Sequence, residues 1–314
     1  MLKRENPLQS HKKIINSSIF EANTFCVMKK KGYLTLLSLF ATFCVSAQYT
    51  EIINSNRPGV SMSAYGVGKN VLQFEGGLFM EKQQHERLLT ESTFTGIDFA
   101  ARYGLFLERL EIAWEGVFQR EKRTDNSTFP AFTSSSSNFL YHSVGLKYLV
   151  FDPYKNPRKV NVYSWRANNS FQWKDLIPAV SLYAGVNLNF GDNVFWPEEE
   201  GPSPRAVLAT QHHFLSRWVL VTNISYDRFT TEDPVFGYVV TLTHALPNPK
   251  WSVYAEHQGS KSTAYADGIF RGGVAHLLSN DLQLDATFGI NIKDTPSRIF
   301  GNIGVAYRLD YHKD

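Results

Sequence analysis

Apolar and polar side chains alternate along most of this chain. Between Asp281 and Ile292 the even positions carry Leu, Ala, Phe and Ile, whereas the odd positions carry Asp, Gln, Thr, Gly and Asn. Successive side chains on a β-strand point to opposite faces, so each such segment has one apolar and one polar face. The pattern predicts twelve strands, over 70–82, 92–104, 108–120, 138–150, 177–190, 204–215, 217–229, 235–246, 250–259, 268–278, 281–292 and 299–310.

The connections between these strands separate a membrane barrel from a soluble sandwich. The connections are numbered here from the first hairpin onward. The even-numbered ones are tight turns, except 151–176. Within that connection, residues 160–176 predict a short amphipathic helix or an ordered loop. Long outer loops alternating with short turns are typical of outer-membrane barrels, and so is an even number of strands. The fold predicted is therefore all-β, a transmembrane antiparallel up-and-down β-barrel, with a soluble periplasmic sandwich as the alternative. The odd-numbered connections, which are long and polar, are 83–91, 121–137, 191–203, 230–234, 260–267 and 293–298.

One face of these strands is suited to contact with lipid. On three of the strands most positions of one parity are large and apolar, and aromatic residues gather near strand ends, as in interfacial girdles. The last strand alternates up to Tyr311, close to the C-terminus. We expect outer-membrane lipids and the barrel-insertion machinery as partners. The predicted lipid-facing residues on the three strands are Leu110, Ile112, Trp114, Phe118, Trp218, Leu220, Ile224, Tyr226, Phe236, Tyr238, Val240 and Leu242.

The N-terminal region has the features of an export signal. Three lysines follow Met28, an apolar stretch follows them, and small residues precede Gln48. This order predicts a secretory signal peptide over 28–47 with cleavage between Ala47 and Gln48. Residues 1–27 match no structural pattern, so we interpret them as a spurious or disordered leader that precedes the true start.

Removal of this region changes the cysteine content and the charge. Both cysteines, Cys26 and Cys44, lie in it, so we predict no disulfide and no thiolate metal site in the mature chain. Residues 1–47 hold seven Lys/Arg and two Asp/Glu, so the formal charge changes from +3 to −2 when they are removed. The basic balance belongs to the leader, and we expect no nucleic acid as a partner. The chain has no run of 18 apolar residues, which excludes a membrane-spanning helix.

The polar parity would line the lumen of the barrel. Unpaired charges in a narrow lumen are costly, so salt bridges are the simpler interpretation, and a charge-selective path is the sharper one. The segment 48–69, rich in Gly, Ser, Asn and Pro, could fold back into this lumen. Arg57 would then reach Glu75, Glu111 or Glu115. The charged residues predicted for the lumen and this lumenal segment are Arg57, Glu75, Asp98, Arg102, Glu111, Glu115, Lys147, Asp227, Glu256, Arg271, Asp285 and Arg308.

The histidines and serines show no catalytic arrangement. His142 and Ser143 are adjacent, so on a strand they would point to opposite faces and could not act as a pair. His212 and His213 are separated in the same way and could not bind one metal ion together. We therefore predict no catalytic, cofactor-binding or metal-binding residue.

A family resemblance adds to this interpretation. Residues 56–63 read Asn-Arg-Pro-Gly-Val-Ser-Met-Ser, and residues 67–77 continue Val-Gly-Lys-Asn-Val-Leu-Gln-Phe-Glu-Gly-Gly. This opening resembles that of the family described as "Putative MetA-pathway of phenol degradation", with Asn56 in place of the usual Asp and Asn70 in place of a Gly. The resemblance implies a transporter-like barrel in the outer membrane.

The domain organisation and function follow from these predictions. After the leader and signal peptide we expect a lumenal N-terminal segment over 48–69 and an outer-membrane barrel over 70–314, in a Gram-negative cell envelope. The predicted function is passage of a small solute without chemical conversion. The alternatives are a structural or assembly barrel of an envelope complex and, more distantly, an outer-membrane hydrolase. The pattern defines neither the solute nor the oligomeric state.

Overall fold

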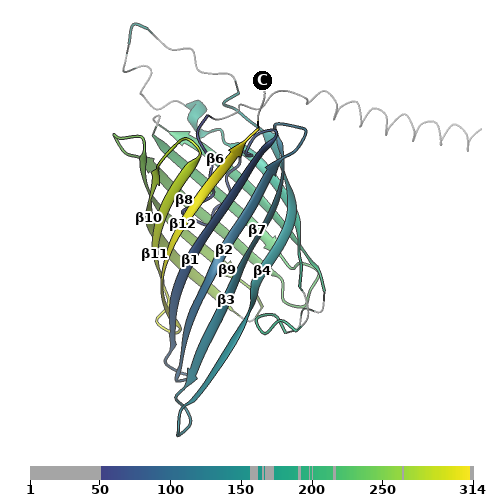
Figure 1. Ribbon diagram of the computed structural model, residues 1–314, viewed down its shortest axis with the longest axis vertical. Helices are drawn as coiled ribbons and strands as arrows, with labels where there is room; N and C mark the ends of the chain where they lie inside the picture. Colours follow the sequence, from purple (N-terminus) through teal and green to yellow (C-terminus); the bar gives the residue numbers. More distant parts are fainter. Residues whose placement is uncertain are drawn as a thin grey trace, which may run out of the picture. The chain divides into compact units, whose positions relative to one another are not determined.

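A closed β-barrel forms the body of the computed structural model (Figure 1). The structure describes residues 51–155, 162–164, 166, 173–189, 192–197, 199, 201–214, 217–263 and 265–311. All neighbouring strands pair antiparallel in chain order, and the first and last strands close the ring. The strands are β1 (Val71–His85), β2 (Thr90–Gly104), β3 (Leu110–Asp125), β4 (Phe132–Phe151), β5 (Ala179–Asn187), β6 (Ser203–Phe214), β7 (Trp218–Asp227), β8 (Val235–Ala245), β9 (Trp251–Lys261), β10 (Ala266–Leu277), β11 (Leu282–Asn291) and β12 (Ser297–Asp310).

The twelve predicted strands are confirmed, in a single up-and-down barrel. Strand β1 pairs with β12 from Val71, opposite Asp310, to Gln84, opposite Ser297, so the closing seam is paired along nearly its full length. We call the end of the barrel with the connection 278–281 the turn end and the end with the connection 86–89 the loop end. Complete closure removes the free sheet edges that a sandwich would leave.

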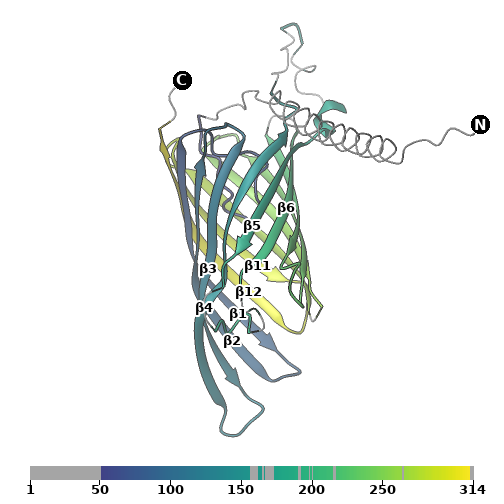
Figure 2. The ribbon, with the colours of Figure 1, turned by 90° about the vertical axis from the view of Figure 1, so that its right-hand side faces the viewer.

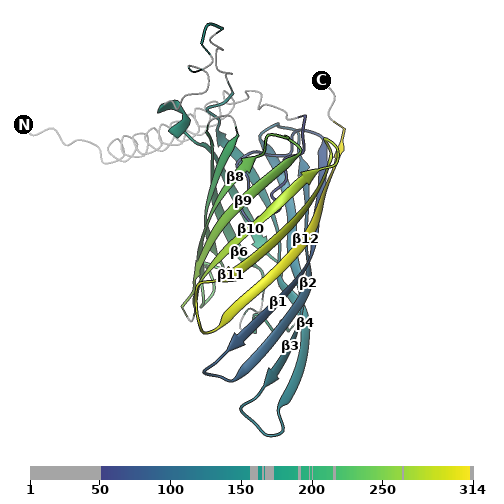
Figure 3. The same cartoon turned by 90° about the vertical axis from the view of Figure 1, so that its left-hand side faces the viewer.

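The barrel wall is taller on one side than on the other. Strands β1 to β4 have 15 to 20 residues, whereas β5 has nine. A strand of about ten residues is long enough to cross a bilayer, so the β1–β2 and β3–β4 hairpins project beyond the loop end. Figures 2 and 3 show both hairpins extending past the remaining strands.

These projections correct the prediction of uniformly long outer loops. Most of 83–91 and 121–137 is strand, and the connections are only 86–89 and 126–131. The sequence pattern missed this because both faces of a projecting hairpin meet water and carry no apolar parity. Ser134, for example, pairs with Arg123 in a ladder of polar residues. The contrast in length between loops and turns is therefore weaker than predicted.

The part of β4 nearest the loop end has no strand neighbour on its β5 side. Pairing between β4 and β5 begins only at Ser143, opposite Asn187. Side chains of the connection 188–202 cover part of this edge, since Asn193 Nδ2 donates to Phe139 O and Trp196 Nε1 donates to Leu140 O, at 2.9 and 2.6 Å. Such cover limits the tendency of an edge strand to pair with another chain.

The connection between β4 and β5 contains one described helical element. This is a 3-10 helix of four residues, η1 (Trp173–Leu176). Most of the predicted amphipathic segment lies outside the described residues. No helix among the residues described has both the length and the hydropathy needed to span a membrane.

The outward faces of the strands carry the predicted apolar belt. Trp114, Phe118, Ile224 and Phe236 are exposed, and Ile112 is half-buried. Exposed residues of this kind recur on the outer parity around the ring, as expected for a surface whose solvent is hydrocarbon rather than water.

Candidate functional site

The described residues ahead of β1 fold back into the lumen. We call residues 51–70 the lumenal plug. It enters at the turn end, where Ile53 N donates to Asn280 O at 2.8 Å. It then bends within the lumen and returns to the turn end, where β1 begins. The plug contains no regular secondary structure, so its backbone polar groups need partners from the barrel wall.

Amide side chains of the wall bind the middle of the plug. Asn223 Oδ1 accepts from Met62 N at 2.6 Å and Asn223 Nδ2 donates to Met62 O at 2.8 Å, which reproduces the pairing of two backbone strands. Gln211 Oε1 accepts from both Ser63 Oγ and Ala64 N. Because Asn223 and Gln211 are buried, these bonds replace hydration that the side chains would otherwise lose.

The opposite wall binds the bend of the plug. Glu256 accepts from Val60 N at 3.0 Å, and the hydroxyls of Tyr254 and Thr287 both donate to Pro58 O. Gln283 Nε2 donates to Arg57 O at 3.1 Å. The plug is thus hydrogen-bonded to strands on both sides of the barrel.

The guanidinium of Arg57 is the main charged contact of the plug. It donates to both oxygens of Asp285 at 3.0 Å and to Asn302 Oδ1 at 2.7 Å, and it forms a salt bridge with Asp98. Asn302 Nδ2 in turn donates to Asp98 Oδ2 at 2.6 Å. One cation therefore joins β2, β11 and β12 across the closing seam.

Two glycines make room for this guanidinium. A Cβ atom built on Gly304 would lie 2.0 Å from Arg57 Nη2, and one built on Gly77 would lie 2.5 Å from the same nitrogen. Both distances are far below van der Waals contact, so any side chain here would displace Arg57. Gly77 and Gly304 are paired across β1 and β12, which places the gap in the wall directly beside the cation.

The predicted partners of Arg57 were wrong. The carboxylates of Glu75 and Glu111 both bind Arg102, at 3.1 and 3.0 Å, and Glu115 binds Arg205. These three acids are already neutralised by cations of the wall, which leaves Asp98 and Asp285 to receive Arg57.

A second ionic cluster lies beneath the return of the plug. Lys147 Nζ lies 3.0 Å from Glu111 Oε1 and donates to the carbonyls of Ser63 and Tyr65. Arg102 also donates to plug carbonyls, at Asn54 and Tyr65. The two cations and the acids Glu75 and Glu111 carry no net charge together, and all four side chains are buried. The cluster thus binds both the incoming and the returning part of the plug to β1, β2, β3 and β4.

The plug also reaches the connection that follows β4. Tyr65 Oη donates to Asp152 Oδ1 at 3.1 Å. Burial raises the pKa of the Tyr65 phenol, and the neighbouring carboxylate of Asp152 raises that pKa further. The Tyr65 hydroxyl therefore stays protonated at neutral pH and is the donor of this hydrogen bond.

Two further ion pairs line the wall nearer the loop end. Glu115 binds Arg205 at 2.7 Å, with the guanidinium 5.5 Å from the ring centroid of Tyr141. Glu256 binds Arg271 at 3.1 Å, and that guanidinium lies 5.0 Å from the ring centroid of Phe300. Each cation has an acid and an aromatic ring, so this part of the wall combines paired charges with apolar surface.

The remaining predicted lumen residues lie near the two ends of the barrel. Asp227 accepts from Asn187 and Arg228 toward the loop end. Arg308 donates to Asp281 and to Glu51 O at the turn end. All twelve predicted charges therefore face inward or belong to the plug, but they form several clusters rather than one ring.

Sequence reasoning missed several contacts that hold the plug. The amides Gln211, Asn223 and Asn302 carry no charge and were passed over, although each shares the inward parity of its strand. Arg205 was also missed, and its parity with Gln211 on β6 is the signal that could have found it.

The histidines flagged in the sequence lie on both faces of the wall. His142 contacts Trp114 Nε1 at 2.6 Å on the outer face, while Ser143 accepts from Arg205 inside. His212 stacks on Phe214, whereas His213 lies beside Tyr65 of the plug. Among the residues that the structure describes, no group of three or more His, Cys, Asp or Glu side chains could hold a metal ion. The predicted cleavage site at Ala47 and Gln48 lies outside the described residues.

The fold and lumen define an outer-membrane type of β-barrel with a plug formed by its own N-terminal segment. The chain belongs to the family described as "Putative MetA-pathway of phenol degradation", whose model matches residues 55–309. That range includes most of the plug and all twelve strands except the last residue of β12, so the resemblance of the N-terminal opening extends along the barrel.

The solved structures to which this chain is similar are distant in sequence. An outer membrane channel from Pseudomonas putida F1 is 10% identical, with a TM-score of 0.51, and the match covers 82% of this chain and 100% of that chain. The toluene transporter TodX from Pseudomonas putida is 10% identical, with a TM-score of 0.47 over 84% of this chain and 99% of that chain. The CymD monoaromatic hydrocarbon channel is 10% identical, with a TM-score of 0.44 over 78% and 90%. No curated protein matches the chain in sequence.

Proposed function

We propose that this protein lets a small solute pass across the outer membrane without converting it, and that the plug controls the passage. The observation that carries the proposal is the polar nature of the plug contacts. Asn223 and Gln211 hold the plug through neutral hydrogen bonds, which water can replace at a modest net cost, and Arg57 and Glu256 add stronger, charged ones. The plug also has apolar contacts with the wall, since Met62 and Ala64 each belong to a small buried cluster, but its backbone is bound along its length by polar side chains.

Export to the outer membrane is part of this proposal. It is supported by the outward apolar belt, by the closed antiparallel barrel and by the signal-peptide pattern over residues 28–47. The passage would run from the loop end, which faces the outside, to the turn end, which faces the periplasm.

The wall on the loop side of the plug favours a small neutral solute with an aromatic character. Arg205 and Arg271 are each paired with a glutamate, and each lies beside an aromatic ring. The electrostatic potential of this part of the wall is therefore not dominated by charge of one sign. Charge-selective pores use rings of unpaired like charges instead. Phenol, the compound in the family description, fits this lining and is the solute that we propose to test.

Conductance in planar bilayers tests the role of the plug. Arg57→Ala removes the cation that holds Asp98 and Asp285, so we expect higher conductance or longer open times than in the unmodified protein. Arg87→Ala, in the exposed connection 86–89, is the matched control and should leave the current unchanged. In the conducting variant, phenol should cause transient blocks of the current, whereas an equal concentration of sulfate should not.

A structural or assembly barrel is the second candidate function. The contacts of the plug with β1 to β4, β6, β7, β9, β11 and β12 favour it, because so many partners describe a firmly closed lumen. Folded protein would then be silent in bilayers with or without Arg57. Heat-modifiable gel mobility establishes that each variant is folded.

A further inference from the structure

On the outer face of β1, β2 and β3, the side chains change from apolar to cationic near the loop end. Leu78, Ile97 and Phe118 are paired in one row across the three strands and are 60%, 45% and 37% exposed. Their side chains belong to the outward parity, so this row is part of the apolar belt. It is the last row on these strands in which all three outward residues are large and apolar.

Cations replace the apolar side chains within the next two outward rows. Arg120 lies in the first of these rows, and its Nε donates to Ser135 Oγ at 3.0 Å. The second row pairs Lys82 with Thr93 and Thr93 with Lys122. Both lysines are exposed, and Glu91, an acid on the same face, lies one row further toward the hairpin tips.

The spacing of the two lysines suits a ligand that both can contact. They lie two strands apart, which separates their Cα atoms by about 10 Å. Each carries a flexible four-carbon stem that ends in three donors, so both ammonium groups can reach one anion placed over Thr93. The hydroxyl of Thr93 adds a donor at the centre of the row.

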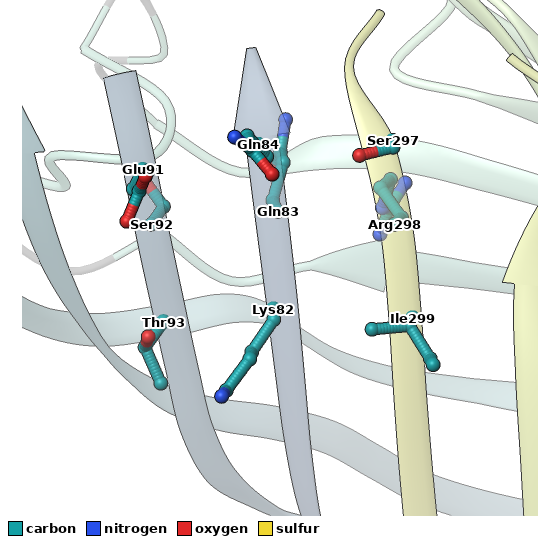
Figure 4. Close-up of a pocket in the computed structure, with 9 residues that line it drawn as sticks. All are labelled: Lys82, Gln83, Gln84, Glu91, Ser92, Thr93, Ser297, Arg298 and Ile299. Atoms are coloured by element: carbon teal, nitrogen blue, oxygen red, sulfur yellow. The ribbon is translucent and has the colours of Figure 1, made fainter. Parts of the chain in front are cut away.

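A shallow hollow of about 340 Å³ lies at this place (Figure 4). The outward residues that line it are Lys82, Thr93 and Ile299, with Gln84, Glu91 and Ser297 toward the hairpin tip. Gln83, Ser92 and Arg298, which have the inward parity, also border it, and Lys122 lies beside it on the next strand. Figure 4 shows the side chain of Lys82 extending from β1 toward the strand that carries Thr93. The hollow therefore brings together a cation, a hydroxyl and an apolar side chain on the outside of the barrel wall.

We propose that this surface binds the phosphate of an outer-leaflet glycolipid of the lipid A type. The phosphate contacts Lys82, Thr93 and Lys122, and the acyl chains run toward the turn end over the apolar row, which lies two outward rows away. The border between cations and exposed apolar residues is the reason to choose a lipid, because a free phosphate gains nothing from the apolar row. The proposal rests on the outer-membrane location proposed above, and it concerns a surface outside the lumen.

Native mass spectrometry of the folded, detergent-solubilised protein tests the proposal. The probe is diphosphoryl lipid A, compared with lipid A whose phosphates have been removed. Replacing both lysines, Lys82→Gln with Lys122→Gln, should weaken binding of the diphosphoryl form by roughly thirtyfold, since each cation near a lipid anion contributes to the attraction. Lys261→Gln is the matched control, because Lys261 is also an exposed outward cation near the loop end but lies on β9.

Three results would overturn the proposal. They are equal binding of the dephosphorylated lipid, an equal loss with Lys261→Gln, and displacement of lipid A by millimolar inorganic phosphate, which would indicate a general anion site. Heat-modifiable mobility confirms that the variants are folded, and the two single substitutions serve if the double variant is not. Binding is measured without any flux, so a failure here is distinct from a failure of solute passage.

Discussion

A methyl group at Gly304 should release the plug. The added Cβ would lie 2.0 Å from Arg57 Nη2, 2.2 Å from Cζ and 2.3 Å from Nε. Ordinary contact begins near 3.4 Å, so the guanidinium must move by about 1.4 Å. Its bonds to Asp285 and Asn302, now 3.0 and 2.7 Å long, would then exceed hydrogen-bonding distance.

The size of the effect follows from the bonds that are lost. Arg57 makes three hydrogen bonds to Asp285 and Asn302. A hydrogen bond to a charged group contributes about 1.5–3 kcal/mol, so losing two of the three costs the docked plug about 3–6 kcal/mol. This corresponds to a change of roughly 10²- to 10⁴-fold in the equilibrium between docked and released plug.

Hydrogen exchange of the plug amides measures that equilibrium directly. The amides of Val60, Met62 and Val67 are bound by wall side chains and should exchange faster in Gly304→Ala by the same factor. Gly301→Ala is the control on the same strand, because a Cβ there has its nearest contact at 3.8 Å. If the two variants exchanged alike in folded barrels, Arg57 would not be the contact that holds the plug.

Two further substitutions test the buried charges and the outer face. Glu111→Gln leaves Arg102 and Lys147 without their shared carboxylate, and we expect the free energy of unfolding in urea to fall by about 3–5 kcal/mol. The control, Glu86→Gln in an exposed connection, should change that free energy by less than about 0.5 kcal/mol. Equal effects of the two substitutions would contradict the role of the cluster. Phe288→Arg places a charge in the apolar belt and should cost about 2–4 kcal/mol in lipid vesicles, whereas Phe129→Arg, at a fully exposed position in the connection 126–131 of the projecting hairpin, should not. A neutral result at Phe288 would mean that this face does not meet hydrocarbon.

The strand pattern predicted the faces of the barrel well because its period is two. Once Asp285 and Glu111 are assigned to strands, their parity places them opposite the apolar residues of the belt, and no further information is needed. The same argument reaches Lys147 and Arg102. Strand positions and inward charges could therefore be predicted from the chain alone.

The contacts across the lumen could not be predicted in the same way. Arg57 pairs with Asp98 and Asp285, whereas Arg102 and Arg205 bind the acids that the sequence suggested for it, and that competition depends on three-dimensional distances. The projecting hairpins were missed for a different reason. Residues such as Ser134 are solvated on both faces, so backbone pairing continues there without any apolar signal.

The contacts of Arg57 also constrain the order in which the molecule can assemble. Arg57 is separated from Asp285 by 228 residues and from Asn302 by 245, although it precedes the first strand. Contacts between such distant parts of a chain form late, after the entropy of closing the intervening loop has been overcome. The set of wall residues that binds Arg57 is thus complete only when the last hairpin, β11–β12, has formed. A docked plug is therefore a mark of a barrel whose synthesis and closure have both finished.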